Sequence, residues 1–237
     1  MRANFLLPVL LVSAISAKGS PLELIDQLKK EVIRISVANT DRSDHLEEVR
    51  LRLNPLVDAL ENHFIENRPG NEAELLKGVW KSIWYDDPTI GNRIAGIQLD
   101  RNAIYQIIYD EFYYNVSSSV IKIGTKNIPV YHSYLKGLYT LVDRPIDADD
   151  VSRELNVIDL EFADNYARFG PLPKVETLYQ QTLKIDEKKI KAIRIPGPKG
   201  ITGRLWNAYL DQDIRIARGV QDNFHERENL YILIRVH

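Results

Sequence analysis

The sequence predicts a mainly β protein in which an α-helical lead-in precedes an antiparallel β-barrel. Apolar residues recur at helical spacing up to about residue 70. From there, short runs rich in β-branched and aromatic residues alternate with turn residues. The 237 residues suffice to bury a substantial core. We therefore divide the chain into a targeting segment (1–17), a helical lead-in (18–70) and a barrel (71–237).

Composition narrows the classes of function. The chain is 44% hydrophobic and 27% charged, which is typical of a globular protein. Its formal net charge is −2 and its pI is about 6.2, so we expect no nucleic-acid partner, because phosphate binding favours a basic surface. The absence of cysteine excludes disulfides, thiolate catalysis and zinc–thiolate sites.

The first seventeen residues resemble a secretory signal peptide. Arg2 precedes an apolar run from Phe5 to Ile15, and the small residues Ser16 and Ala17 follow. The run is too short to span a bilayer as a helix. A buried N-terminal segment and an interfacial anchor are the alternatives.

Three helices are expected in the lead-in. Ser20-Pro21-Leu22-Glu23 is a capping box with proline at the first helical position, and the helix after it should end near Ala38-Asn39. A second helix should begin near Ser43. Asn54-Pro55 should interrupt it and start a third, short helix. Arg68-Pro69-Gly70-Asn71 then breaks the helical pattern.

The rest of the chain contains about ten candidate strands. A long series of short strands with turns between them favours a meandering antiparallel barrel or a sandwich, and closure into a barrel removes exposed edges. The candidate strands are 80–85, 94–98, 103–109, 113–121, 129–141, 157–162, 177–185, 191–195, 205–217 and 230–236.

No catalytic constellation stands out. The five histidines lack metal-ligand spacing, and His132 and its neighbour Ser133 would point to opposite faces of a strand. Asp211 and Asp213 would share one strand face, which a divalent cation could use. Arg215 would share that face too, so a salt bridge is the simpler explanation. We therefore predict a binding protein without metal or cofactor; catalysis on a lipid-like substrate through Asp211, Asp213 or His132 is the alternative.

Two segments resemble the plastid lipid-associated protein family, also called PAP/fibrillin. The first is Leu75-Leu76-Lys77-Gly78-Val79-Trp80, followed by Trp84-Tyr85. The second is Tyr209-Leu210-Asp211-Gln212-Asp213-Ile214-Arg215-Ile216-Ala217-Arg218-Gly219, with a final apolar strand after it. The Asn54-Pro55 stretch of the lead-in also resembles that family. The resemblance covers about residues 20 to 237.

The resemblance implies a lipocalin-like barrel that binds or organises lipids or isoprenoids such as carotenoids and prenylquinones, without catalysis. It implies a plastid or thylakoid location, entered here through the N-terminal segment; export to a periplasm or secretory lumen is the alternative. The implied partners are an apolar small molecule or lipid and a membrane surface. A filled barrel that docks on a membrane or membrane complex is the alternative function.

Strand alternation suggests roles for the opening tryptophans. Trp80, Ser82 and Trp84 should face the barrel interior, because Lys81 between them prefers solvent. Similarity to lipocalins suggests that an arginine covers Trp80, with Arg215 or Arg218 preferred to Arg235. Trp84 would then be the better cavity wall. The ligand-cavity candidates are Trp84, Ser82 and Trp80; the barrel-closing candidates are Gly78, Trp80, Asp211, Asp213, Arg215 and Arg218.

Overall fold

The first helix begins and ends as its sequence predicts. The computed structural model describes residues 20–41, 45–86, 96–145, 154–186, 188–189, 191–221 and 228–237, so the predicted targeting segment lies outside the described residues. Helix α2 (Pro21–Ala38) starts with the predicted capping box: Ser20 Oγ accepts the Glu23 N–H at 3.4 Å, and Glu23 Oε2 accepts the Ser20 N–H at 2.8 Å. The helix is capped at Asn39.

The next helix is continuous, so the predicted break at Asn54-Pro55 is wrong. Helix α3 (Leu46–Glu66) contains Pro55 in its interior. A proline frees the carbonyl four residues earlier, which belongs to Leu51. Leu51 is 51% exposed, so this turn lies on the solvent side of the helix. The apolar residues of α3 bury one face on both sides of the proline, and this packing holds the helix together. The short helix α4 (Glu72–Leu76) follows.

Eight antiparallel strands close into the predicted barrel. Each pairs with the next along the chain, and the first pairs with the last, in the order β4-β3-β2-β1-β9-β8-β7-β5 with β4–β5 closing the circle. The strands are β1 (Gly78–Tyr85), β2 (Ile97–Ile108), β3 (Phe112–Ile123), β4 (Lys126–Pro145), β5 (Glu154–Phe169), β7 (Thr202–Leu210), β8 (Ile214–Gln221) and β9 (Asn229–Arg235), and β6 (Ile193–Arg194) is a short addition beside β5.

Two predicted strands are wrong, and two others, 94–98 and 103–109, correspond to one strand, β2. Residues 177–185, rich in Thr, Leu and Tyr, lie in helix α5 (Val175–Asp186). Its buried residues Leu178, Thr182 and Ile185 recur at helical spacing. The prediction gave the β propensity of the segment more weight than this spacing. Residues 205–217 form two strands, β7 and β8, because the chain turns at 211–213.

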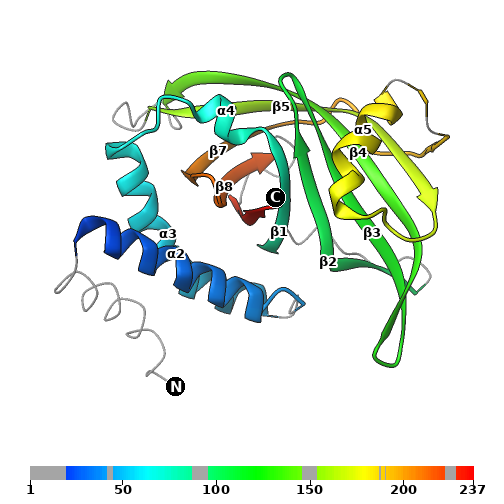
Figure 1. Cartoon of the computed structure of the whole chain (residues 1–237), viewed down its shortest axis with the longest axis horizontal. Coiled ribbons are helices and arrows are strands. Elements are labelled where there is room, and N and C mark those ends of the chain that lie inside the picture. Colours follow the sequence, from blue (N-terminus) through cyan, green and yellow to red (C-terminus); the bar gives the residue numbers. More distant parts are fainter. Residues whose placement is uncertain are drawn as a thin grey trace.

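Helices cover the outside of the barrel in two places (Figure 1). Helices α2 and α3 pack on each other and share an apolar cluster with β1, β7, β8 and β9. Helix α5 shares a second cluster with the outer residues of β2, β3 and β4, among them Tyr114 and Tyr134. The outward residues of most strands are therefore core residues, and the inward ones are left to form a cavity.

Candidate functional site

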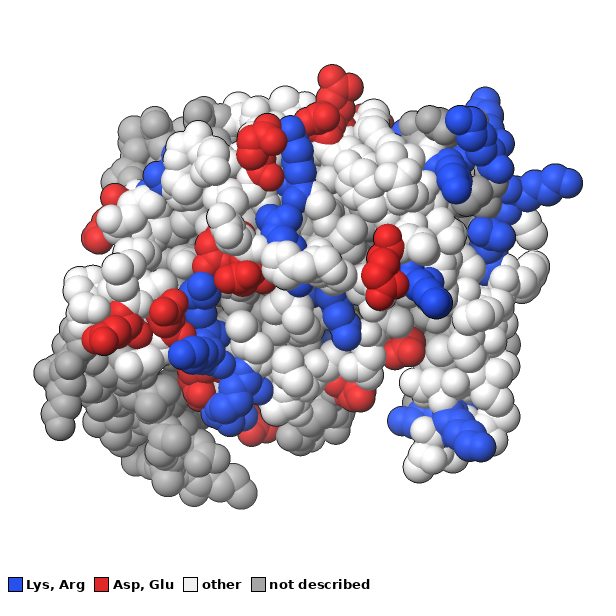
Figure 2. All heavy atoms as spheres, viewed as in Figure 1, with Lys and Arg blue, Asp and Glu red and all other residues white. Residues whose placement is uncertain are grey.

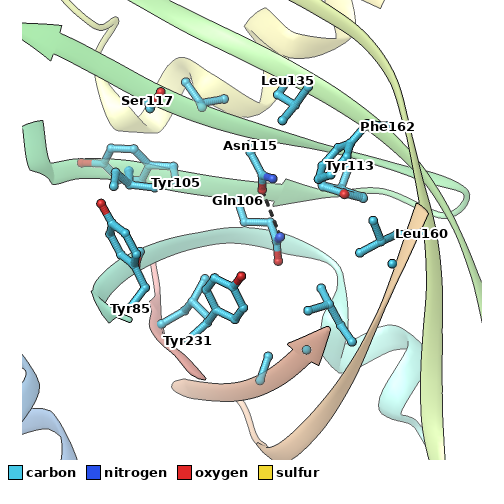
Figure 3. Close-up of a pocket in the computed structure, with 18 of the residues that line it drawn as sticks. Tyr85, Tyr105, Gln106, Tyr113, Asn115, Ser117, Leu135, Leu160, Phe162 and Tyr231 are labelled. Carbon is cyan, nitrogen blue, oxygen red and sulfur yellow. Dashed lines mark hydrogen bonds between the residues drawn. The ribbon is translucent and has the colours of Figure 1, made fainter. Parts of the chain in front are cut away.

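The barrel holds a cavity of about 420 Å³, and all eight barrel strands contribute to its wall. Figure 3 shows aromatic rings and aliphatic side chains turned into this space, with a few polar groups between them. Mainly apolar walls with a small number of polar groups are typical of ligand sites. Apolar lining residues include Leu99, Ile104, Leu135, Leu160, Phe162 and Leu233.

A bulge in β1 decides which opening residues reach the cavity. Ser82 pairs with Leu233 and Trp84 pairs with Ile232, so Ile83 is the extra residue. After the bulge the faces exchange: Ser82 and Tyr85 line the cavity, whereas Trp84 does not. Trp84 is 0% exposed and belongs to the cluster beneath α2 and α3. The expectation that Trp84 faces the interior is therefore wrong, because strict alternation does not continue through a bulge.

Trp80 lies where α4 meets the barrel, and it is not a lining residue of the cavity. Its indole N–H donates to the Leu76 carbonyl at 2.8 Å. The guanidinium of Arg235 lies 4.1 Å from the Trp80 ring, a cation–π geometry. Arg235 also donates to the carbonyls of Lys77, at 2.7 Å, and Leu75. The arginine over Trp80 is thus Arg235, and the preference for Arg215 or Arg218 is corrected.

Gly78 allows this closure. Its φ is +118°, a conformation that L side chains rarely adopt, and a Cβ there would stand 2.8 Å from Arg235 Nη1. Glycine therefore gives the arginine room to reach the Trp80 ring. This is the physical reason for a glycine two residues before the tryptophan.

Asp211 and Asp213 lie in the β7–β8 turn rather than on one strand face. Asp211 Oδ1 accepts the N–H groups of Asp213 and Ile214 at 2.8 and 2.9 Å, which shapes the turn. Its Oδ2 lies 2.5 Å from Lys29 Nζ of α2. Asp213 is exposed, and its carbonyl accepts the Arg235 N–H at 2.8 Å. In the described part of the chain, no group of three or more acidic or histidine side chains is placed to hold a metal ion.

Arg215 points into the cavity, so its predicted salt bridge with the aspartates is wrong. It is 1% exposed and lines the cavity wall. Its Nε donates to Asn207 Oδ1 at 2.8 Å, and its Nη1 donates to Gln106 Oε1. Burial lowers the pKa of Arg215 to about 10, and nearby Tyr139 and Tyr113 oppose this shift. The side chain is therefore a buried cation at neutral pH.

Arg218 lies three residues further along β8 and faces outward. Its guanidinium contacts Asp58 at 2.5 Å, Glu228 at 2.8 Å and Glu61 at 3.1 Å. Burial alone would lower the pKa of Arg218, but these carboxylates, Glu61 first, more than offset it and raise the pKa. Arg218 thus joins α3 to the barrel and the segment before β9.

A family model described as PAP_fibrillin matches residues 26–225. The chain belongs to the PAP/fibrillin family. Searches of curated proteins and of solved structures returned no match. The matched region begins within α2 and extends past the end of β8, so both predicted motifs lie within it. Across the described ranges, no helix is both long and apolar enough to cross a membrane.

Only part of each PAP/fibrillin motif lies close to the other in the structure. The Gly78–Trp80 segment and the 211–213 turn meet through Arg235, which bonds Lys77 and the Gln212 carbonyl. Arg215 stands inside the barrel and Arg218 outside it. His132, which the sequence offered as a catalytic alternative, lies outside the cavity wall. Its Nδ1 is 3.1 Å from the Gly170 carbonyl, and burial lowers the pKa of its ring.

Sequence reasoning missed the other polar groups of this PAP/fibrillin cavity. Gln106 donates through Nε2 to Asn115 Oδ1 at 3.1 Å, the contact drawn as a dashed line in Figure 3. Tyr113, Asn115 and Ser117 are alternate residues of β3 and all line the cavity. Polar residues at every second position of a central strand were the available signal. Asp86, directly after β1, was not singled out by the sequence analysis; it is 0% exposed, pairs with Arg50 and accepts the Leu230 N–H at 2.6 Å.

Proposed function

We propose that this PAP/fibrillin protein binds an apolar, isoprenoid-type molecule inside its barrel without reacting with it. The observation that carries the proposal is the cavity of about 420 Å³ with its mainly apolar wall. Ligand sites of about 300 to 1,000 Å³ are typical for small molecules. Carotenoids and prenylquinones are the ligand classes that the family suggests; a longer one would place only part of its length in this space.

The cavity favours this function over the two alternatives. A barrel that served only as a docking scaffold would have its interior filled by side chains, as small barrels commonly are. A catalytic role has no support in the positions of the candidate groups. His132 lies outside the cavity wall, Asp211 is bonded to Lys29 and the turn, and Asp213 is exposed in the β7–β8 turn.

Exposed residues at one end of the barrel support action near a membrane. The β3–β4 hairpin extends beyond the Ile97–Ile121 pair, at the end opposite Gly78. Ile121, Ile123 and Ile128 are 38%, 60% and 46% exposed there, beside the exposed Lys122 and Lys126. Apolar side chains flanked by lysines suit an anionic lipid surface. Figure 2 shows Lys and Arg gathered at this hairpin and over the end of α5. A plastid or thylakoid location is part of the same proposal.

The experiment is a titration of the full chain with retinol, a neutral isoprenoid alcohol whose fluorescence rises in apolar surroundings. Ala217 lines the cavity, so Ala217→Phe should weaken retinol binding by about tenfold or more. Ala38→Phe, at the exposed end of α2, is the matched control and should bind like wild type. Equal binding by wild type and both variants, or no binding by wild type, would reject an internal binding site.

A further inference from the structure

The described wall of the cavity carries a single charge. Among the described residues that line it, Arg215 is the only charged side chain, and no Asp or Glu is among them. In the same described part of the chain, its hydrogen bonds reach only Asn207 and Gln106, and no carboxylate pairs with it. A buried cation without an anionic partner is costly.

The neighbouring groups do not neutralise Arg215. Asn207 and Gln106 are neutral amides. Burial raises the pKa of Tyr113 well above its usual range, and burial also raises that of Tyr139. Both phenols therefore keep their protons at neutral pH. Within the described residues, the positive charge of Arg215 is therefore not compensated, and it lies in a mainly apolar space.

The amides beside Arg215 are oriented to present a second donor. Arginine can only donate, so it fixes the oxygen of Gln106 toward itself and turns the amide nitrogen of Gln106 to Asn115 Oδ1. This arrangement leaves the Asn115 amide nitrogen as a donor on the cavity wall, with no acceptor among the described residues. The hydrogen-bonded series therefore runs from the Arg215 cation through Gln106 to the N–H group of Asn115. It suits a ligand that carries hydrogen-bond acceptors.

We propose that the ligand of this cavity carries one acidic head group, a carboxylate, on its apolar chain, and that Arg215 binds this carboxylate. The inference rests on the proposed function and specifies the ligand's head group. One arginine compensates one negative charge. A diphosphate would bring more negative charge than this single cation can balance. A planar carboxylate also matches the fork of a guanidinium.

The test compares three ligands that share the farnesyl chain and differ in head group. Farnesol, farnesoic acid and farnesyl diphosphate are titrated into the full chain by calorimetry at neutral pH. A charge-assisted hydrogen bond predicts that farnesoic acid binds about ten- to a hundredfold more tightly than farnesol. Equal binding of farnesol and farnesoic acid would overturn the head-group inference while leaving the proposed function in place. Binding of none of the three would overturn both.

Two further ligands check the charge and the chain. Methyl farnesoate keeps the shape of the acid without its charge, and it should bind like farnesol. Butyrate keeps the carboxylate without the chain, and it should not displace farnesoic acid. Tighter binding of farnesyl diphosphate than of farnesoic acid would overturn the inference that the ligand's head group carries a single negative charge. Displacement by butyrate would contradict the inference that the ligand binds through an apolar chain.

The matched variants are Arg215→Gln and Arg218→Gln, on opposite faces of the same strand. Arg215→Gln should lower the affinity for farnesoic acid to that for farnesol and leave farnesol binding within about twofold. Arg218→Gln should retain the preference for the acid. A preference that survives in Arg215→Gln would overturn the inference. If Arg215→Gln does not fold, the wild-type comparison of farnesoic acid with methyl farnesoate still decides.

Discussion

Arg215 and Arg218 belong to one motif and one strand, yet they stand in opposite surroundings. Arg218 is on the outside, where Asp58, Glu61 and Glu228 contact its guanidinium. Arg215 is on the inside, where the amides of Asn207 and Gln106 are its only recorded partners within the described residues. An odd separation along a strand places two side chains on opposite faces, and this alone separates the two environments.

The difference distinguishes a structural surface from a binding surface. The outer surface of β1, β7, β8 and β9 is covered by α2 and α3, and its buried cation, Arg218, is paired with carboxylates. The inner surface encloses a cavity and carries Arg215, which has no counterion among the residues that the structure describes. Changes on the outside should therefore affect the stability of the fold, and changes on the inside should affect the ligand.

The largest effect is expected at Trp84. It is fully buried beneath the helices, so Trp84→Ala should lower the free energy of unfolding by about 3 to 5 kcal/mol. Ser82→Ala, on the cavity wall two residues earlier, should cost much less. Urea unfolding followed by circular dichroism measures both. If Trp84→Ala abolished retinol binding at unchanged stability, the assignment of its ring to the outer surface would be wrong.

The two arginines should differ in the same assay. Arg218→Gln removes the cation that contacts the buried Glu61 as well as Asp58 and Glu228, and it should cost about 3 kcal/mol. Arg215→Gln removes a buried charge that no acid in the described ranges balances, so its cost without ligand should be below about 1 kcal/mol. An equal loss of stability in both variants would remove the contrast between the two faces of β8.

A smaller effect is expected at Asp211, which joins α2 to the β7–β8 turn. Burial alone would raise the pKa of Asp211, but the hydrogen bond from Lys29 and the N–H groups of Ile214 and Asp213 lower it further than burial raises it. The carboxylate therefore stabilises the fold above its unfolded pKa of about 3.9, and this contribution disappears as the pH falls through the lower folded value.

Asp211→Asn should accordingly cost about 1 kcal/mol at neutral pH, and the gap to wild type should narrow in acid. Urea titrations at pH 7 and near pH 3 measure the gap. Asp213→Asn is the matched control and should change little, since the Asp213 side chain is exposed. A gap that widened in acid would contradict the sign of the pKa shift at Asp211.

Local signals in the sequence predicted most of the fold. The capping box at Ser20 set the start of α2, and the series of short strands predicted the barrel that forms. The 211–213 turn and α5 were missed for a common reason. The residues on both sides of the turn and those of α5 include β-branched and aromatic types that favour strands. Only the carboxylate that bonds the turn and the packing of α5 on the outer barrel surface decide otherwise.

The cavity was harder to predict than the barrel. One extra residue at Ile83 reverses the faces of β1, so strict strand alternation assigned Trp84 to the cavity-facing position that Tyr85 occupies. Asn115 and Gln106 come from neighbouring strands, and only the register of β2 with β3 brings them together. Strict alternation across residues 211–215 also predicted Arg215 and Asp213 on one strand face, whereas Asp213 lies in the turn and Arg215 in β8.

A crystal structure of the full chain with farnesoic acid would test the central claim most directly. The account predicts the apolar chain inside the barrel among Leu135, Leu160 and Phe162, with the carboxylate within hydrogen-bond distance of the Arg215 guanidinium. A ligand bound only to the outer surface, or a carboxylate held elsewhere while Arg215 contacts only Gln106 and Asn207, would contradict it.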